Sequence, residues 1–527
     1  MDDKNKKPGL LQLLEQGIGS LRFGAFRGNR GYDAASTGAR YAPWQGSILG
    51  PNTIQLADWE PLLRRSRDAI RNSALAASAI GKFESNIIGT GIVPHFTHPD
   101  PDIRKAIQKA FDRWVKQADF RGQVSFYGLQ AALARSLFET GECFCRYHVV
   151  DDGPYFQLQL IETEQVPIYL NMVSAGAIEQ WPNSVVREGI IFNQNTDRRL
   201  GYRIYGGNPY DTIVNAPGSY RYFNVGIDEM IHVMKPLRPN MLRGVPMMAA
   251  VLPLLYDIEG YADSERLRKR IASMFAFFLT KNSLTESAFP ANSFQQPSNN
   301  SGALDSRVEP GTIFALEPGE TMEAPELPNT GDYQSFMYVE LHKFAAGVGL
   351  TYEQLTGDMK GVNYSSARVA LLEFRRAAEQ FQNHIIIDQF CNPVLSRWMK
   401  EAVMSGALEL PSDYVENPED YEACSWVSDG FEWVDPVKEV QAYQMAVRSG
   451  FTSRSMVIRK SGFDPEQVDA QIADERKREA TLGIITDTNS NLVLIGRETQ
   501  PLTPTQADPN ATSDQEAQEA EDAQDDE

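Results

Sequence analysis

Apolar and polar positions between residues 330 and 404 predict two long helices joined by a short loop. Before Gly347, apolar side chains recur at about every third or fourth position, as on one face of a helix; they are Phe336, Val339, Leu341, Phe344 and Ala345. Residues 365–404 contain no glycine and one proline, so a second, long helix is expected there. The polar segment between them holds Gly357 and Gly361, which favours a loop. Such a loop presents a few side chains to a molecule that moves past it.

The N-terminal half of the chain predicts helices first and strands later. Residues 1–57 are rich in glycine, arginine and serine and are expected to form an extended arm. Helical periodicity follows over three ranges, namely 58–87, 102–117 and 127–139. Two hairpins come next, 143–150 with 155–161 around Asp-Asp-Gly-Pro, and 190–193 with 201–205 around a polar turn. This order predicts a mixed α+β domain.

The remaining segments predict more helix, one small β region and two polar stretches. Residues 246–280 read as a long helix that begins near Pro246, apolar in its first half and charged in its second. Residues 281–310 are rich in Asn, Ser and Pro and predict a loop, followed by short strands around Pro318-Gly319. Two or three short helices are expected up to Leu482, with starts at Asp435-Pro436 and Asp464-Pro465.

Composition places the chain among soluble globular proteins of several domains. It has 527 residues, of which 42% are apolar and 23% charged, and a net charge of −20. Nine acidic and no basic residues lie within 508–527, so this tail is expected to be disordered. No signal-peptide core is present, and the longest apolar run, residues 245–256, is interrupted by two prolines. We therefore expect a soluble, intracellular protein.

The four cysteines are too few for a disulfide framework. Cys143 and Cys145 are two residues apart, which places them on one face of a strand, and a C-x-C pair alone is weak evidence for a metal. We expect small, core-facing thiols.

Motifs that would indicate catalysis are missing from the sequence. It contains no GxxxxGK[ST] nucleotide loop, no HExxH and no GxSxG, and its six histidines lack ligand spacing. Asp151 and Asp152 stand beside Gly-Pro and read as a turn, and residues 89–94 read as a tight turn with a left-handed glycine. We therefore expect no enzyme activity, no metal and no cofactor.

Several short motifs, in order along the chain, resemble the portal proteins of tailed bacteriophages, specifically the lambda-like group. They are RDAIRN (67–72), IIGTGIVP (87–94), TGECFCR (140–146), QLQLIETEQVP (157–167), HVMKPLRPNMLRGVP (232–246), PGTIFALEPGE (310–320) and GLTYEQLTGDMKGVNYSSAR (349–368). Each motif is short, but the ordered set covers roughly residues 60 to 480 and is fairly specific.

The resemblance implies a portal-type fold. Its parts would be an arm (1–57), an α+β wing (58–245), a stem helix (246–280), a clip with some β-structure (281–330), a second stem helix (331–349), a tunnel loop (350–364), a long helix and further wing (365–432), a helical crown (433–485) and a linker with the acidic tail (486–527).

The resemblance also implies a function. It implies a ring, expected to be dodecameric, at one capsid vertex, through which double-stranded DNA is packaged and ejected without sequence specificity. The implied partners are the terminase large subunit, the major capsid protein and head–tail connector proteins, with no membrane. The location would be the virion and, during assembly, the host cytoplasm. Two alternatives stay open, namely a terminase or nuclease component and a minor capsid structural protein.

The candidate site under this resemblance is the tunnel loop. We expect its residues to face DNA; they are Thr356, Gly357, Asp358, Met359, Lys360, Gly361, Val362 and Asn363. Asn363 and the following Ser365 are alternatively expected to cap the next helix.

Two groups of basic residues are further candidates for contacts. The stem residues Arg266, Arg268, Lys269 and Arg270 are a second candidate DNA contact, which a solvated helix face or ion pairs between subunits would explain equally well. For Arg64, Arg65, Arg67 and Arg71 we expect subunit contacts.

The acidic net charge is compatible with a DNA conduit. Duplex affinity comes largely from Lys and Arg that release counterions, so a charge of −20 opposes tight binding. Many phosphate contacts repeated around a ring would hold the duplex and stop it from sliding. A sequence-specific DNA binder is therefore disfavoured.

Overall fold

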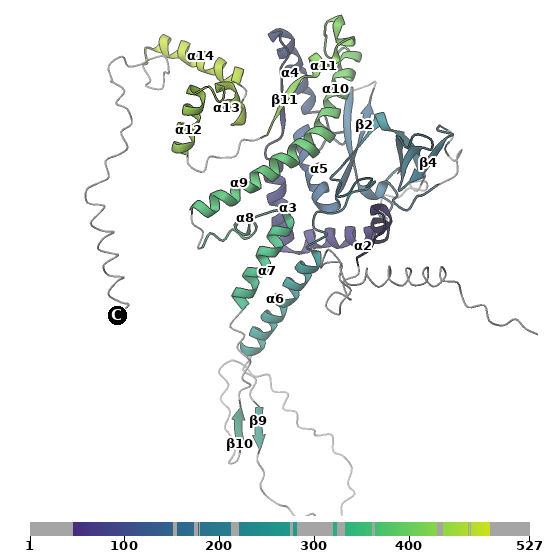
Figure 1. Ribbon diagram of the computed structural model, residues 1–527, viewed down its shortest axis with the longest axis vertical. Coiled ribbons are helices and arrows are strands. Elements are labelled where there is room, and N and C mark those ends of the chain that lie inside the picture. Colours follow the sequence, from purple (N-terminus) through teal and green to yellow (C-terminus); the bar gives the residue numbers. More distant parts are fainter. Residues whose placement is uncertain are drawn as a thin grey trace, which may run out of the picture. The chain divides into compact units, whose positions relative to one another are not determined.

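The structure is a computed structural model (Figure 1). It describes residues 46–150, 155–172, 178, 180–211, 221–273, 278–281, 320–323, 333–360, 364–428, 436–461, 463 and 465–484. The chain divides into two units, Met1–Asp429 and Gly430–Glu527. Among the described residues, the strands and the longest helices belong to the first unit, whose α+β composition confirms the expected fold class.

The helices of the N-terminal part are α2 (Pro51–Asn72), α3 (Ala74–Ile87), α4 (Pro101–Val115) and α5 (Phe126–Thr140). The prediction of one helix over 58–87 is wrong in two respects. The helix begins at Pro51, within the predicted arm, because proline suits the first helical turn. It breaks at Ser73, whose backbone is extended and whose Oγ accepts a hydrogen bond from the Ala76 N–H at 3.4 Å. α4 and α5 lie within two residues of their predicted bounds.

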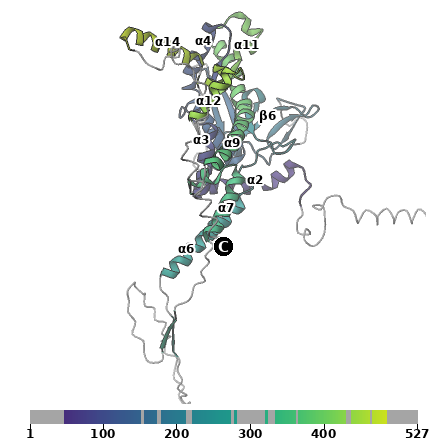
Figure 2. The same ribbon diagram turned by 60° about the vertical axis from the view of Figure 1, so that its left-hand side comes forward.

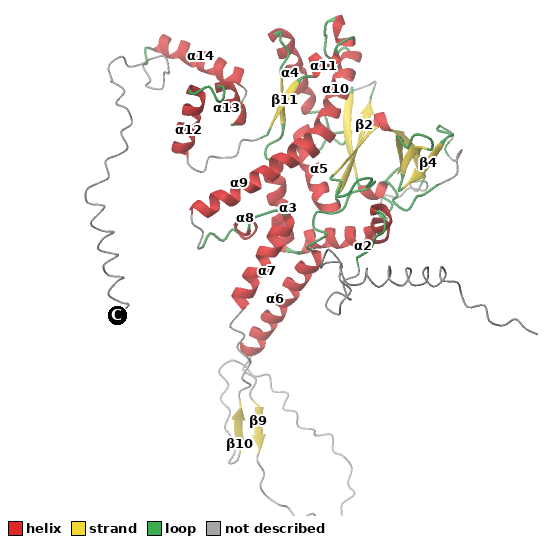
Figure 3. Cartoon of the chain, in the orientation of Figure 1, coloured by secondary structure: helices red, strands yellow, loops and turns green. Residues whose placement is uncertain are grey.

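The described strands of the first unit form four small sheets (Figure 3), the fourth of which is described below. The three-stranded sheet has the order β3-β2-β8, from Phe156–Ile161, Glu142–Val149 and Met230–Met234. The four-stranded sheet runs β4-β5-β6-β7, from Ser184–Arg187, Ile190–Asn193, Arg199–Tyr205 and Tyr222–Gly226. The third sheet pairs β1 (Val93–Phe96) with β11 (Cys424–Val427). Both predicted hairpins are confirmed, β2 with β3 and β5 with β6.

The core lies between the sheets and the helices and is rich in aromatic rings. One cluster joins the two larger sheets through Phe144, Ile161, Val166, Ile190, Phe192, Tyr202, Ile204, Val225 and Met230. A second group of rings surrounds α4, where Phe111 meets Trp398 at 5.0 Å and Trp114 meets Phe156 at 5.8 Å between centroids. Cys143 and Cys145 are buried, which confirms the prediction of core-facing thiols.

Two helices, α6 (Leu252–Ser273) and α7 (Tyr333–Val348), lie side by side in the first unit (Figures 1 and 2). The prediction of helix over 246–280 is wrong at both ends. Pro253, not Pro246, lies in the first helical turn, and residues 278–281 form strand β9 (Phe278–Lys281). β9 pairs with β10 (Glu320–Glu323), while residues 282–319, including most of the predicted clip, lie outside the described residues. α7 agrees with its predicted range.

The predicted long helix over 365–404 contains a change of helix type. It consists of α9 (Tyr364–Phe381), the π-helical segment η4 (Gln382–Cys391) and α10 (Asn392–Met404). The Asn392 N–H donates to the carbonyl of Ile387, five residues back. Pro393, which has no N–H and whose ring clashes with an α-helical turn, follows immediately, and the wider turn accommodates it.

Shorter elements complete the first unit. They are the 3₁₀ turns η2 (Thr163–Gln165), η3 (Ile227–Glu229) and η5 (Ser412–Val415), and the short helices α8 (Tyr352–Thr356) and α11 (Pro418–Glu422). The two consecutive positive φ angles of Glu188 and Gly189, 53° and 79°, make the tight turn between β4 and β5. The predicted left-handed glycine turn is confirmed, since φ is 58° at Gly89 and 133° at Gly91.

The second unit contains three helices in its described part, α12 (Pro436–Arg448), α13 (Arg454–Lys460) and α14 (Pro465–Leu482). The expected starts at Pro436 and Pro465 and the end at Leu482 are confirmed. Asp435 and Asp464, the predicted caps, lie outside the described residues. In the part of the chain that the structure describes, no helix is long and apolar enough to cross a bilayer.

Candidate functional site

The candidate loop begins where α7 ends. Gly349 has a φ of 77°, and the Leu350 N–H returns to the carbonyl of Ala345 at 2.9 Å, which closes the helix. Leu350 is buried, so the chain turns inward at this point. Thr351 and Gln354 then form a capping box at the start of α8, each side chain accepting a hydrogen bond from the other's N–H, at 3.2 and 3.0 Å.

Contacts with α3 and α7 hold α8 in place. The Ser78 hydroxyl of α3 donates to the carbonyl of Leu355 at 2.8 Å, and the Leu355 side chain is 4% exposed. The ring of Tyr352 stacks on His342 of α7 with centroids 4.3 Å apart and planes at 7°. The first half of the predicted loop is therefore an anchored helix, and the expectation of loop over 350–364 is wrong for Tyr352–Thr356.

Hydrogen bonds within the chain shape the tip of the loop. Gly357 closes α8 with a φ of 73°. The Thr356 hydroxyl donates to the carbonyl of Tyr352 at 2.8 Å and accepts the Asp358 N–H at 3.2 Å. Asp358 Oδ1 accepts the Lys360 N–H at 3.0 Å, so the hydroxyl of Thr356 and the carboxylate of Asp358 both order the turn.

The residues that the tip presents are Met359 and Lys360. Met359 is 69% exposed, and Lys360 is exposed too. Gly361, Val362 and Asn363 lie outside the described residues, and the alternative role of Asn363 and Ser365 as helix caps stays a prediction. Of the predicted loop residues, Thr356, Gly357 and Asp358 build the turn. Met359 and Lys360 remain exposed at its surface.

The basic residues predicted on α6 are balanced by acidic neighbours on the same helix. Arg266 pairs with Asp263 at 3.0 Å, and Arg268 pairs with Glu265 at 2.7 Å. Lys269 lies 3.8 Å from the same Glu265 and places its ammonium group over the ring of Tyr333. α6 carries four acidic and four basic residues, so its net charge is zero. These pairs leave little uncompensated positive charge for a phosphate backbone.

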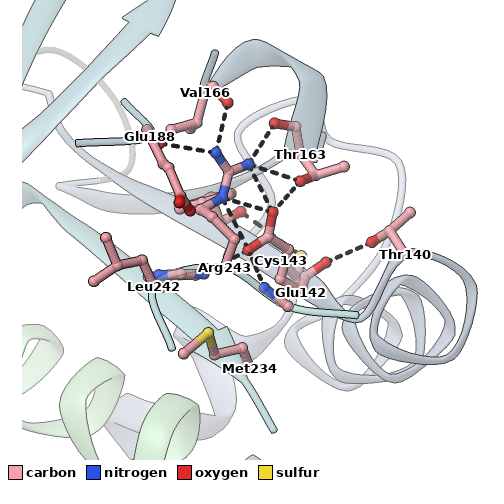
Figure 4. A network of polar contacts seen from close by, with 12 residues as sticks. Thr140, Glu142, Cys143, Thr163, Val166, Glu188, Met234, Leu242 and Arg243 are labelled. Atoms are coloured by element: carbon pink, nitrogen blue, oxygen red, sulfur yellow. Dashed lines mark hydrogen bonds and ion pairs between the residues drawn. The ribbon is translucent and has the colours of Figure 1, made fainter. Parts of the chain in front are cut away.

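A buried charge cluster, which the sequence did not reveal, joins the two larger sheets (Figure 4). Arg243 is fully buried, and its guanidinium group donates to Glu142 Oε1 at 2.6 Å and to the carbonyls of Val166 and Glu188 at 3.0 and 2.9 Å. It also donates to the carbonyl of Thr163 at 3.1 Å. One side chain therefore connects β2, η2 and the turn after β4.

Glu142 is the acceptor at the centre of this cluster. Besides Arg243, it accepts the Gly244 N–H at 2.8 Å and lies 2.9 Å from Nε2 of His232. Burial raises the pKa of this carboxyl group, but the charge of Arg243 and the bond with His232 outweigh burial and hold the pKa well below its usual range. Burial lowers the pKa of His232. Glu142 is thus an anion beside a cation, shielded from water.

Close backbone contact fixes the same region. A Cβ atom added at Gly141 would lie 2.1 Å from the backbone of Val245, and one added at Gly244 would lie 2.2 Å from the carbonyl oxygen of Gly141. The motifs at 140–146 and 232–246 therefore meet in space, although about a hundred residues separate them. Their role in this structure is to lock the fold, since the described cluster is enclosed.

Arg67 lies within a chain-internal network rather than at a free surface. It pairs with Glu139 at 2.9 Å and also with Glu164, whose side chain is 4% exposed. Two carboxylates of its own chain therefore engage Arg67, whose side chain is still 25% exposed, and the subunit contact stays a prediction. Arg64 and Arg65 are exposed, and Arg71 lies 3.8 Å from Asp68 at the surface.

A groove on α4 gathers basic residues for which the sequence analysis named no role. It has a volume of about 380 Å³ and is lined by Lys105, Gln108, Lys109, Asp112, Arg113 and Lys116. The sequence does indicate this basic face, because these residues recur at helical spacing. Among the described residues, no group of three His, Cys, Asp or Glu side chains is arranged to hold a metal.

The chain is similar to known phage proteins over most of its length. The family described as "Phage portal protein, lambda family" matches residues 37–382. The probable portal protein of Halomonas phage phiHAP-1 is 25% identical over 444 residues, which cover 81% of this chain and 82% of that protein. The portal protein of Escherichia phage N15 is 22% identical over 453 residues, covering 80% and 84%. Among solved structures, a chain in the neck of the native gene transfer agent particle, computed with C12 symmetry, is 14% identical with a TM-score of 0.41, covering 85% of this chain and 99% of that chain.

Proposed function

Because the chain belongs to the lambda family of phage portal proteins, we propose that its copies close into a ring at a capsid vertex through which duplex DNA passes. A single subunit cannot surround a duplex, so a head-to-tail interface that closes is required. The proposed ring is dodecameric, has no catalytic role, and docks the terminase large subunit, the major capsid protein and head–tail connector proteins. Its place is the portal vertex of the virion, after assembly in the host cytoplasm.

Exposed apolar side chains on α6 and α7 carry this proposal. The two helices share a face, where Tyr261 stacks on Tyr333 at 5.6 Å and meets Phe336 at 4.8 Å. Large apolar residues nevertheless remain 44–80% exposed; they are Tyr256, Leu267, Phe336, Tyr338 and Val339. Apolar side chains gathered on one helix pair are typical of a surface that another subunit covers.

The elements take the following roles in this proposal. α6 and α7 are the stem, and β9 with β10 belongs to the clip. The sheets with α2 to α5 and α9 to α10 form the wing, and α12 to α14 form the crown. Met359 and Lys360 at the tip of the loop face the DNA.

Electron microscopy of the purified full-length protein tests the ring. Negative-stain images are expected to show annular particles with a central hole. Val339→Asp places a charge on the exposed side of α7, where burial against a second copy would cost several kcal/mol, so rings should be lost. Met404→Asp, at a residue 72% exposed near the end of α10, is the matched control and should leave rings intact. Monomers or compact dimers of the unaltered protein would contradict the proposal.

A deletion tests the role of the loop. Removing residues 358–362 spares Thr356 and Gly357, which close α8. Rings should form as before, while packaging or retention of DNA should fall. Loss of the ring itself would show that the segment is structural.

A further inference from the structure

The basic groove on α4 consists of four cations on one face of a helix. Lys105, Lys109, Arg113 and Lys116 are separated by four, four and three residues, and all four are exposed. At 100° and 1.5 Å per residue, this spacing keeps them on one side of the helix in a row about 16 Å long. Lys116 is the residue after the last turn and still has helical angles, with φ −73° and ψ −17°.

These cations are not compensated within the described part of the chain. None of the four makes an ion pair with a described carboxylate, in contrast to the arginines of α6. The one acidic residue in the row, Asp112, accepts a hydrogen bond from Gln108 at 3.0 Å. The groove is therefore a local concentration of positive charge on a chain with a net charge of −20.

The opposite face of α4 is fixed in the core, so the row is held on a rigid support. Ile107 and Phe111 are fully buried, and the Trp114 indole N–H donates to the carbonyl of Phe156 at 2.8 Å. Asp100 caps the start of the helix by accepting the Asp102 N–H at 2.8 Å. Binding to this face would require little reorganisation of the backbone.

We propose that this face of α4 binds the phosphate backbone of duplex DNA without reading its sequence. Lysine binds phosphate as a point charge, and three of the four cations are lysines. No aromatic or large apolar residue lines the groove, whereas the centres of protein interfaces are enriched in aromatics and depleted in lysine. Single-strand sites stack bases on aromatic rings, which the groove lacks. The inference rests on the proposed function for the choice of DNA as the polyanion, and it adds a contact outside the loop.

The expected binding is weak and depends strongly on salt. Four phosphate contacts would give a slope of about −3.6 in log K against log salt, at about −0.9 for each contact. Asp112 and the acidic remainder of the chain reduce the affinity. Such a contact holds DNA loosely, which remains compatible with movement of the duplex.

Fluorescence anisotropy with a labelled random-sequence duplex of about 30 base pairs tests the inference, at salt concentrations from about 50 to 200 mM. The test variant is K105Q/K109Q/R113Q/K116Q in the full-length protein. The matched control removes the same four charges from α6, as R266Q/R268Q/K269Q/R270Q. The α4 variant should bind at least about tenfold more weakly at the lowest salt and lose about 3.6 from the slope of log K against log salt, while the α6 variant should bind nearly as the unaltered protein does.

Several outcomes would overturn the inference. They are an α4 variant that binds like the unaltered protein, an α6 variant that loses as much, and tighter binding of a single strand or of an acidic peptide at equal charge. A second variant, K105R/K109R/K116R, keeps the charges and should keep the binding, which separates charge from folding. Negative-stain images of each variant separate the two proposals. Intact rings with unchanged DNA binding sink the α4 contact alone, whereas absence of rings from the unaltered protein sinks the proposed function.

Discussion

The Arg243 cluster and helix α6 each place an arginine beside a glutamate at almost the same distance. Arg243 Nη2 lies 2.6 Å from Glu142, and Arg268 Nη2 lies 2.7 Å from Glu265. The difference lies in their surroundings, because both partners of the first pair are fully buried, whereas the Arg268 side chain is 27% exposed. Water reaches Arg268 and screens its pair with Glu265, which is 7% exposed, but it cannot reach the buried pair. Although the two pairs have nearly the same distance, they should therefore contribute unequally to the free energy of unfolding.

The largest loss of stability is expected when one partner of the buried pair is removed. Arg243→Met leaves Glu142 as a buried anion without its arginine and removes the bonds to three carbonyls, so the free energy of unfolding should fall by about 3 to 5 kcal/mol. Urea denaturation at neutral pH measures the loss. The double variant R243M/E142L removes both charges and should be more stable than R243M. A single variant within about 1 kcal/mol of the unaltered protein would contradict the role of the cluster.

Glu188 tests the influence of burial on one unpaired carboxylate next to the cluster. Burial raises its pKa to about 7, and its Oε2 has no hydrogen-bond partner in the described structure. Between pH 4.5 and 7 the folded state then holds more protons than the unfolded state, so stability falls as pH rises through that window. Glu188→Gln should stabilise the protein by roughly 1 to 2 kcal/mol at about pH 8, after allowance for solvent screening, and not below about pH 4.

Denaturation curves across this pH range check the prediction for Glu188. The control, Glu416→Gln, changes an exposed carboxylate and should have little effect at any pH. A gain from Glu188→Gln that does not vary with pH would show that the side chain acts through packing rather than charge.

Thr351 is intermediate between the buried pair and the α6 pair, because its neutral side chain caps α8 and is half buried. Thr351→Ala removes one half of the capping box and should cost about 1 kcal/mol. The loss should also raise the rate of proteolytic cleavage near α8, which precedes the exposed tip. Thr351→Ser keeps the hydroxyl and should behave as the unaltered protein. Equal cleavage of both variants would show that the contacts with α3 and α7 hold α8 without the cap.

The smallest effect is expected on α6. Glu265→Gln removes the partner of both Arg268 and Lys269, and it should change the free energy of unfolding by less than about 1 kcal/mol, and by less still at high salt. Thermal unfolding at low and high ionic strength measures this. A loss as large as that of Arg243→Met would erase the distinction between the two regions.

Local patterns predicted the elements whose residues are neighbours in sequence. The β2–β3 hairpin and α7 follow from spacing alone, and both agree with the structure. The break at Ser73 was missed because apolar periodicity continues across it, while a single hydroxyl cap decides the boundary. The π segment was missed because it looks the same as an α-helix in composition.

The candidate site was predicted only in part for a similar reason. Met359 and Lys360 lie at an exposed tip, as glycine and polar residues around them indicated. Arg266 and Arg268 were named for their charge, which the acidic residue three positions before each of them neutralises. The Arg243 cluster joins segments far apart along the chain, so no local pattern signals it.

The π-helical segment between α9 and α10 sets the direction in which the side chains of α10 point around the helix axis. One residue corresponds to 100° around an α-helix, so deletion of a single residue from Gln382–Cys391 would turn the downstream half by more than a quarter of a circle. Trp398, now fully enclosed against Phe111, would swing away from its aromatic neighbours. Packing of α10 should therefore tolerate a point substitution in this segment far better than an insertion or deletion.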